Sequence, residues 1–337
     1  MRTRLRGFGR WSATAVLAGT VATTAVAAGA SGAVTPPGIG PDYSLAVAVS
    51  PSNGSAKSVT ATCPPGMKVI GAGGEVTDTG YAHASGDGDA QVSLTDIVPA
   101  ADLRSVTVTA GIRDPLNWNF ATDTFTVTAQ ARCARTLVSP VVTGLERVSG
   151  SAPDNGTSAS HKAATATCTT GKILVGTGFQ LDQANGKVFV NRVWPTGVDD
   201  GVQVDAYDDL LNATGQVALG DLVAPPVYNG VWDLKAFAIC IDKGVSPLTA
   251  AGTDLEGGIS GSTTQSCPAG RVVTTTFVDV QDEWQAGYSA STAAIEALSL
   301  DRNTKKAGPW PVADSSTVRV SIDQTSGWVA FVYPYCR

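Results

Sequence analysis

The chain has 337 residues, of which 43% are hydrophobic, 7% aromatic and 15% charged, and this composition excludes a disordered chain. Its 23 basic and 29 acidic residues leave a net charge of −6, and four of the basic residues lie among the first ten. The rest of the chain is therefore acidic and has no basic stripe that would bind nucleic acid or an anionic membrane face.

Residues 1–33 have the three-part layout of a secretory signal peptide: an arginine-rich start, an apolar stretch and then small residues. Small-x-small cleavage motifs end at three positions, Ala27, Ala30 and Ala33. A membrane anchor is the alternative, but the apolar stretch is rich in Ala and Thr and is soon followed by Pro36 and Pro37. We predict a cleaved leader, no membrane span after cleavage, and a secreted chain that is extracellular or associated with the cell wall.

Short β-branched runs bounded by Gly, Pro, Asn and Asp predict antiparallel strands. They cover residues 44–49, 57–62, 105–109, 188–193 and 317–322. The best helical candidate is the short stretch 291–298. Two segments rich in Ser, Gly and Thr, 150–160 and 257–264, are predicted to be linkers or exposed loops.

The six cysteines fall into three pairs with nearly equal spacing. The pairs are Cys63 and Cys133 at 70 positions, Cys168 and Cys240 at 72, and Cys267 and Cys336 at 69. In an exported chain this spacing predicts three copies of one unit, each closed by its own disulfide. It lacks the close cysteine pairs of a zinc site, so we predict no metal and no cofactor.

The residues after the first cysteine of each pair also repeat. A glycine follows three positions later in each copy, at Gly66, Gly171 and Gly270, where a turn needs a permissive backbone. Gly71 and Gly176 occupy one further shared position, which is Thr275 in the third copy. Each unit ends on a strand that carries the second cysteine, at 125–133, 232–240 and 328–336.

A second repeated spacing joins a proline to a Val-x-Val pair seven positions later. Pro99, Pro195 and Pro311 each show it, which makes Trp194-Pro195 equivalent to Trp310-Pro311 and to Val98-Pro99. The distance between these anchors varies from copy to copy, as expected for surface loops on a shared scaffold. The predicted organisation is a signal peptide at 1–33 and β repeats at 34–135, 136–241 and 242–337.

The Cys-Pro-x-Gly openings at Cys63 and Cys267, the second of which continues as Arg-x-Val, resemble a recurrent module of secreted, mostly uncharacterised actinobacterial proteins. The stretch from Cys168 to Asp182, with Gly171, Gly178-Phe179 and Leu181, is more distantly similar to the vitelline membrane outer layer protein family. That similarity implies three Cys-containing Greek-key repeats in a β-prism. We predict an all-β fold of three homologous antiparallel units, arranged either as beads or as a pseudo-threefold, β-prism-like body.

Catalytic chemistry has few candidates in this sequence. Carboxylate pairs suited to glycoside hydrolysis occur at Asp199/Asp200, Asp208/Asp209 and Asp282/Glu283, but their turn-like surroundings favour solvated loop ends. His83 and His161 are the only histidines, and no nucleophile elbow accompanies them. Asp78, Asp87 and Asp89 lack the full pattern of a calcium loop, so a polar hairpin is the favoured interpretation.

Tryptophans offer the most specific binding hypothesis. Trp232 and Trp328 lie on closing strands and are expected to pack in the core. Trp194 and Trp310, beside prolines at strand ends, are equally compatible with packing and with stacking on sugar rings. The leading hypothesis is a secreted, non-catalytic protein that binds or presents a surface; the alternatives are a carbohydrate-binding module for polysaccharide or cell-wall glycan and a glycoside-active enzyme.

Overall fold

The computed structural model describes the part of the chain that holds the predicted repeats. It covers residues 42–78, 92–112, 124–136, 142–182, 188–197, 200–208, 230–243, 249–250, 253–257, 260–267, 273–282, 293–300, 315–322 and 328–336. All of them belong to one compact unit, Ser31–Arg337. The predicted cleavage sites lie outside the described residues.

Every helix or strand assigned in these residues is a β-strand, which confirms the all-β fold class. The strands of the first repeat are β1 Tyr43–Val49, β2 Lys57–Thr62, β3 Met67–Asp78, β4 Val92–Pro99, β5 Ser105–Ile112 and β6 Phe125–Arg135. Those of the second are β7 Glu146–Ser151, β8 His161–Thr167, β9 Lys172–Asp182, β10 Val188–Thr196, β11 Gly201–Asp208 and β12 Asp233–Asp242. Those of the third are β13 Thr249–Ala250, β14 Thr253–Gly257, β15 Ser260–Ser266, β16 Val273–Asp282, β17 Ala293–Ser299, β18 Ser315–Ile322 and β19 Trp328–Cys336.

The predicted strands are present, but two other sequence predictions are wrong. The helical candidate 291–298 is strand β17, which pairs with β18 on one side and β3 on the other, so strand pairing overrides the helix preference of its Ala, Glu and Leu residues. The predicted linker 257–264 mostly forms β15, which pairs with β18. Segment 150–160 is a connection within the second repeat, because Thr157 forms a bridge with Trp232.

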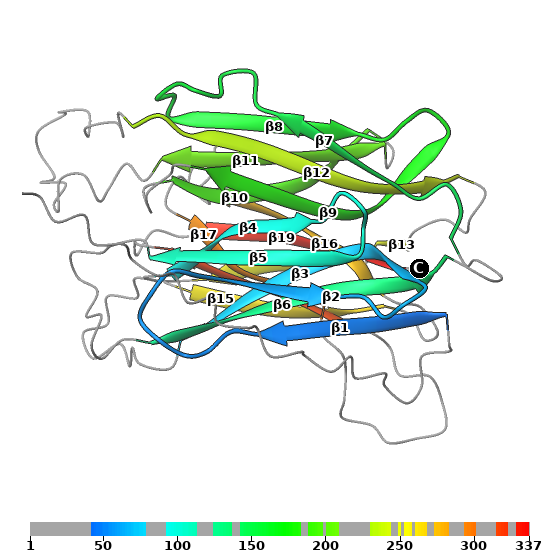
Figure 1. Cartoon of the computed structure of the whole chain (residues 1–337). Helices are drawn as coiled ribbons and strands as arrows, with labels where there is room; N and C mark the ends of the chain where they lie inside the picture. The colour runs from blue at the N-terminus through cyan, green and yellow to red at the C-terminus, as the bar shows by residue number, and fades with distance from the viewer. Residues whose placement is uncertain are drawn as a thin grey trace, which may run out of the picture. The chain divides into compact units, whose positions relative to one another are not determined.

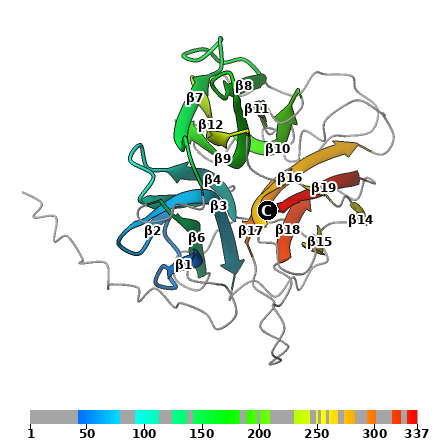
Figure 2. The ribbon, with the colours of Figure 1, turned by 90° about the vertical axis from the view of Figure 1, so that its right-hand side faces the viewer.

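The strands form three antiparallel sheets, and each sheet takes strands from two repeats (Figure 1, Figure 2). The repeat 1–2 sheet has the order β2-β5-β4-β9-β12-β7, and the repeat 1–3 sheet the order β1-β6-β3-β17-β18-β15. The repeat 2–3 sheet has the order β13-β19-β16-β10-β11-β8, with β14 also paired to β19. Every repeat thus gives one half to each of two sheets.

This exchange excludes the predicted arrangement of the repeats as beads. Beads would need sheets that close within a repeat, whereas β4 pairs with β9, β10 with β16, and β17 with β3. These three junctions, here called seams, join repeat 1 to 2, 2 to 3 and 3 to 1, so the pairing is cyclic and pseudo-threefold. At each seam the strand from the preceding repeat carries a β-bulge, at Thr95, Asn191 and Glu296.

The core of a repeat lies between its two half-sheets. In repeat 1 the alternate residues Phe125, Val127, Ala129 and Ala131 of β6 are fully buried and lie on the half-sheet that packs against β5. Fully buried Val106 and Val108 lie on β5. The small alanines keep the two layers close, as interior packing requires.

The three predicted disulfides are confirmed. Cys63 bonds Cys133, Cys168 bonds Cys240 and Cys267 bonds Cys336. Each joins the residue after β2, β8 or β15 to the closing strand of the same repeat, and therefore links two different sheets. The turn glycines behave as the sequence predicted, since Gly66 has φ of 81° and Gly171 of 89°; Gly270 lies outside the described residues.

Candidate functional site

The best-defined polar site lies at the seam between repeats 2 and 3. Arg192 of β10 pairs with Asp205 of β11 and with Asp279 of β16, and paired residues of neighbouring strands share one face. Buried Val193, Val202 and Val204 point to the other face, which forms the core of repeat 2. The site therefore occupies the face that turns away from the core of its own repeat, here called the second face.

Arg192 joins the two carboxylates. Its Nη1 lies 3.4 Å from Asp205 Oδ2 and its Nε lies 3.5 Å from Asp279 Oδ1. Gln203 Nε2 donates to both oxygens of Asp205 at 3.0 and 3.1 Å, and His161 Nε2 lies 3.4 Å from Asp205 Oδ1. We call these five residues the Arg192 cluster. The side chains of Asp205 and Asp279 are only 3% and 7% exposed, so their charges depend on these partners.

Aromatic rings flank the Arg192 cluster. His161 stacks on Tyr207 with ring centroids 4.3 Å apart. Trp194 packs edge-to-face against Tyr333 of β19 at 5.2 Å, and the Arg192 guanidinium lies 5.7 Å from the Trp194 ring. Trp194 is half-buried and packs against the hydrophobic core.

The equivalent seam positions carry different chemistry. In the seam between repeats 1 and 2, Asp96 faces Gln180 and Thr109, and in the seam between repeats 3 and 1, Ala297 faces Glu75. Asp96 accepts hydrogen bonds from the Leu181 amide at 3.2 Å and the Thr95 hydroxyl at 3.1 Å. Burial nevertheless raises the pKa of the Asp96 carboxyl above its usual range.

The raised pKa of Asp96 predicts a pH-dependent contribution to stability. A carboxyl with a raised folded pKa gives its full contribution below the unfolded value and loses it as pH rises through the folded pKa. Asp96→Asn keeps acceptor and donor atoms for Leu181 and Thr95 but cannot ionise. We expect this variant to melt a few degrees higher than wild type at pH 7 and at the same temperature near pH 3. Thermal unfolding from pH 3 to 8 measures this difference.

The exposed Asp102 provides the control for that experiment. Its side chain is 62% exposed, so Asp102→Asn should leave the pH dependence of the melting temperature unchanged. An offset between Asp96→Asn and wild type that stays constant from pH 3 to 8 would contradict a contribution from ionisation.

The proline alignment is wrong in the third repeat. At the three seams, Val193, Ile97 and Leu298 pair with equivalent positions of the neighbouring repeat. The two residues after Leu298, Ser299 and Leu300, therefore correspond to Trp194-Pro195 and to Val98-Pro99. The Val-x-Val match would require Val318 to pair with Leu300, but Val318 pairs with Leu298, two positions earlier. Trp310 and Pro311 lie outside the described residues.

Other predicted residues divide between core, turn and segments that lie outside the description. Trp232 is fully buried and donates from Nε1 to Ala159 O at 2.8 Å, which confirms its core role. Asp200 is exposed in the turn between β10 and β11, and its Oδ1 lies 3.4 Å from Lys243 Nζ. The positions with no described side chain are Asp78, His83, Asp87, Asp89, Asp199, Asp208, Asp209, Asp282, Glu283 and Trp328.

The sequence analysis missed two lysines that stabilise loops, the buried Lys162 and the half-buried Lys57. Lys162 Nζ donates to Thr157 O at 3.0 Å and to Trp232 O, and lies 4.5 Å from the Trp232 ring centroid. In repeat 1, Lys57 Nζ likewise donates to Asn53 O and Phe125 O, both at 2.6 Å, and lies 3.7 Å from the Phe125 ring centroid. Burial lowers the pKa of both lysines. The signal was present, because each lysine lies six residues before a first cysteine.

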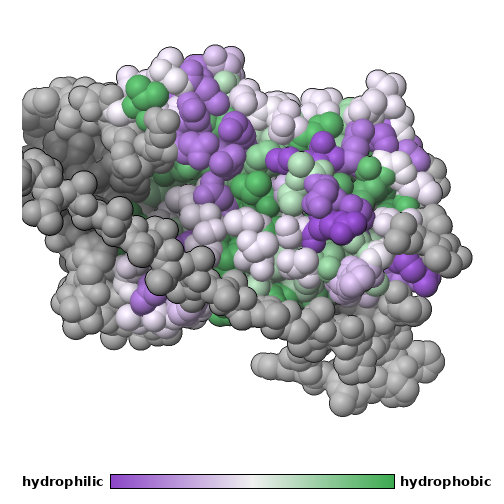
Figure 3. Space-filling view, viewed as in Figure 1, coloured by the Kyte–Doolittle hydropathy of each residue, from purple (hydrophilic) through white to green (hydrophobic). Residues whose placement is uncertain are grey.

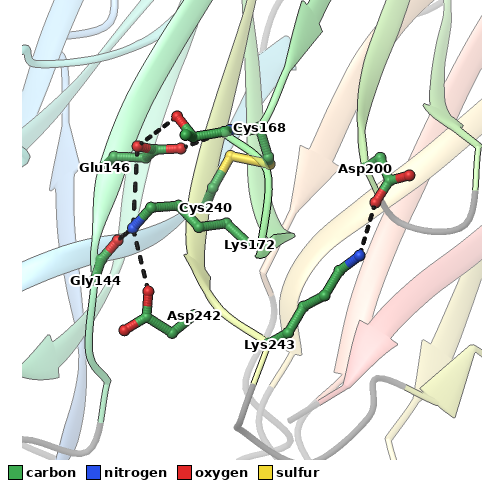
Figure 4. The surroundings of a disulfide bond; sticks show 9 residues. Gly144, Glu146, Cys168, Lys172, Asp200, Cys240, Asp242 and Lys243 are labelled. Atoms are coloured by element: carbon green, nitrogen blue, oxygen red, sulfur yellow. Dashed lines mark hydrogen bonds and ion pairs between the residues drawn. A yellow bond between two sulfur atoms is a disulfide. The ribbon is translucent and has the colours of Figure 1, made fainter.

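Charged side chains also surround the second disulfide (Figure 4). Lys172 Nζ lies 3.3 Å from Asp242 Oδ1, donates to Gly144 O, and lies 4.0 Å from Glu146 Oε2. Glu146 Oε1 accepts from the Thr169 amide at 2.9 Å. These contacts tie the start of β7 to the turn after Cys168, so they are structural.

Comparison of the chain with protein-family models and with curated protein sequences finds no match. Within the described part of the chain, no group of three or more His, Cys, Asp or Glu side chains could hold a metal ion. The same residues contain no helix long and apolar enough to cross a membrane. The three disulfides indicate an oxidising compartment.

Proposed function

We propose that this chain is a secreted, non-catalytic binding protein of the extracellular space or the cell envelope. The observation that carries the proposal is the half-buried Trp194 beside the Arg192 cluster on the second face of the repeat 2–3 sheet. These side chains stand on paired strands and hold one another in place, so a ligand would meet a preorganised surface. The predicted leader and the disulfides support the location.

Carbohydrate is the ligand class that this chemistry favours as a second, more specific candidate. A partly accessible indole stacks on a sugar ring, while guanidinium, amide and carboxylate groups exchange hydrogen bonds with hydroxyls. Trp194, Arg192 and Gln203 supply these groups within one region of the sheet. Because Val98 and Ser299 hold the places equivalent to Trp194, the proposed site is single rather than threefold.

The enzyme alternative has weaker support. Asp200 is exposed and ion-paired with Lys243, an arrangement typical of a solvated turn. The buried carboxylates Asp205 and Asp279 are both ion-paired with Arg192, an arrangement typical of a structural contact. Release of reducing sugar from a polysaccharide by the purified protein would favour the enzyme.

Trp194→Ala tests the binding proposal. We expect it to weaken binding to chitin, cellulose, xylan or purified cell wall, whichever wild type binds, by at least about tenfold, the usual value of a stacked aromatic anchor. Pull-down on the insoluble polymers, with tryptophan fluorescence during titration of soluble oligosaccharides, measures the change.

Val98→Ala is the matched control, since it truncates the side chain at the equivalent place in repeat 1. It should bind as wild type does. Equal binding by Trp194→Ala and wild type would remove this surface from the proposal, and absence of binding to every polymer would remove the carbohydrate class.

A further inference from the structure

Strand β1 is an edge strand without the usual protection against pairing. Among the described strands it pairs only with β6, in a continuous register from Tyr43 to Val49. Its sequence Tyr-Ser-Leu-Ala-Val-Ala-Val contains no charge, no proline and no bulge. Natural edge strands normally carry one of these features because their open amides pair readily with other chains.

The hydrogen bonds at its ends show which backbone groups of β1 face outward. The Ser50 amide donates to Val127 O at 2.9 Å, and Asp42 O accepts from the Arg135 amide at 2.9 Å. Since inward and outward residues alternate in an antiparallel pair, Ser44, Ala46 and Ala48 also face β6. Leu45, Val47 and Val49 therefore direct their N–H and C=O groups toward the open edge.

Two of these three residues, Val47 and Val49, expose hydrophobic side chains, whereas Leu45 is only 6% exposed. Val47 is 37% and Val49 57% exposed, and they are two of the three exposed large hydrophobic residues in the described part of the chain. The pseudo-threefold fold supplies an internal comparison, because Ser149 and Ser151 of β7 hold the equivalent places. β7 also begins with Glu146 and Arg147, so this equivalent strand carries the charges that β1 lacks.

We propose that β1 pairs antiparallel with β1 of a second copy of this chain and joins two repeat 1–3 sheets into one continuous sheet. A twofold axis at Val47 would place Val47 opposite Val47 and Val49 opposite Leu45, and would use the outward amides of all three residues. Pro51 then ends the ladder because it has no amide hydrogen.

The uncharged, self-complementary edge favours a second copy as the occupant. Two copies of this acidic chain repel one another, and they approach most readily where an edge carries no charge. β1 lies at the periphery in both ribbon views (Figure 1, Figure 2). On the part of the face coloured by hydropathy in Figure 3, hydrophobic residues are scattered among polar ones, so no continuous patch there competes with the edge.

Molar mass in solution tests the proposal independently of any glycan binding. By light scattering during size-exclusion chromatography at concentrations from micromolar to millimolar, the secreted protein should reach the dimer mass. Val47→Lys should give the monomer at every concentration, while the matched variant Ser149→Lys should behave as wild type. A wild-type monomer throughout, or a dimer that survives Val47→Lys, would overturn the proposal.

A cysteine at the axis tests the register. Directly opposite residues of a hydrogen-bonded pair have Cα atoms about 5.5 Å apart, within the range of a disulfide. Val47→Cys should therefore form a covalent dimer under mild oxidation, and Ser149→Cys should not. Peptide mapping must show the three native bridges in both variants. Equal cross-linking through the two positions would indicate random collision and reject the axis at Val47.

Discussion

Gly71→Ala is expected to cost the protein about 3 kcal/mol or more of its unfolding free energy, at the upper end of what overpacking does. A Cβ at Gly71 would lie 1.7 Å from Thr274 O and 2.7 Å from Thr274 C, both backbone atoms of the neighbouring repeat. No rotamer change relieves this clash, so β3 and β16 would have to separate. Denaturation followed by circular dichroism measures the loss.

Gly111→Ala is the control for this effect. Gly111 also lies in a strand of repeat 1, but the nearest atom to its Cβ would be Thr95 Cγ2 at 3.3 Å, the end of a side chain. Its stability should change by less than about 1 kcal/mol. If the two variants were equally stable, the close approach of β3 to β16 would be refuted.

The clash at Gly71 explains why the first two repeats have glycine at a place where the third has Thr275. Gly176 is also tightly surrounded, since its Cβ would lie 2.6 Å from Ile70 O. Thr275 holds the equivalent place in repeat 3 and fits there, where its hydroxyl bonds the Thr177 hydroxyl at 2.7 Å. Close backbone approach thus requires glycine at two of the three equivalent places, and threonine fits at the third.

Local signals allowed much of the fold to be predicted. Cysteine spacing predicted the three units and their bridges, and β-branched runs bounded by turn residues predicted strands β1, β2, β5, β10 and β18. Gly66 and Gly171 have the positive φ expected of glycine after the cysteine. Each of these features depends on a few residues close together or on a covalent bond, and such features survive the divergence of the third copy.

The exchange of half-sheets could not be predicted. Each seam consists of only two pairs of strand residues, for example Arg192 with Asp279 and Val193 with Val278. Such short pairing leaves no hydrophobic period that differs from an ordinary strand. The sequence marks a seam only by a polar residue three places before a proline, Asp96 before Pro99 and Arg192 before Pro195. Repeat 3 lacks this mark, because Leu300 replaces the proline.

The candidate site was predictable only in part for the same reason. Trp194 was singled out because it repeats a pattern, but Arg192, Asp205 and Asp279 come from three strands and two repeats. Only the seam brings them together. Burial of two carboxylates around one guanidinium also favours the correct order of repeats, because a different pairing would leave a buried charge alone.

Removing the second disulfide by Cys168→Ala/Cys240→Ala is expected to lower the unfolding free energy by about 4 kcal/mol in the chain-entropy model. The two cysteines are 72 positions apart, so the reduced chain gains much freedom when it unfolds. The bridge also joins the residue after β8 in the repeat 2–3 sheet to β12 in the repeat 1–2 sheet. Guanidinium unfolding of wild type and variant under non-reducing conditions measures the difference.

Glu146→Gln separates the bridge from the polar contacts around it. It keeps an acceptor for the Thr169 amide but removes the charge beside Lys172, and it should cost less than about 1 kcal/mol because the pair is partly solvated. A similar small loss for the cysteine variant would mean that contacts between sheets already restrain the ends of the loop. A loss near the entropic value, with the other two bridges intact, would show that covalent closure stabilises the second repeat beyond the contacts between sheets.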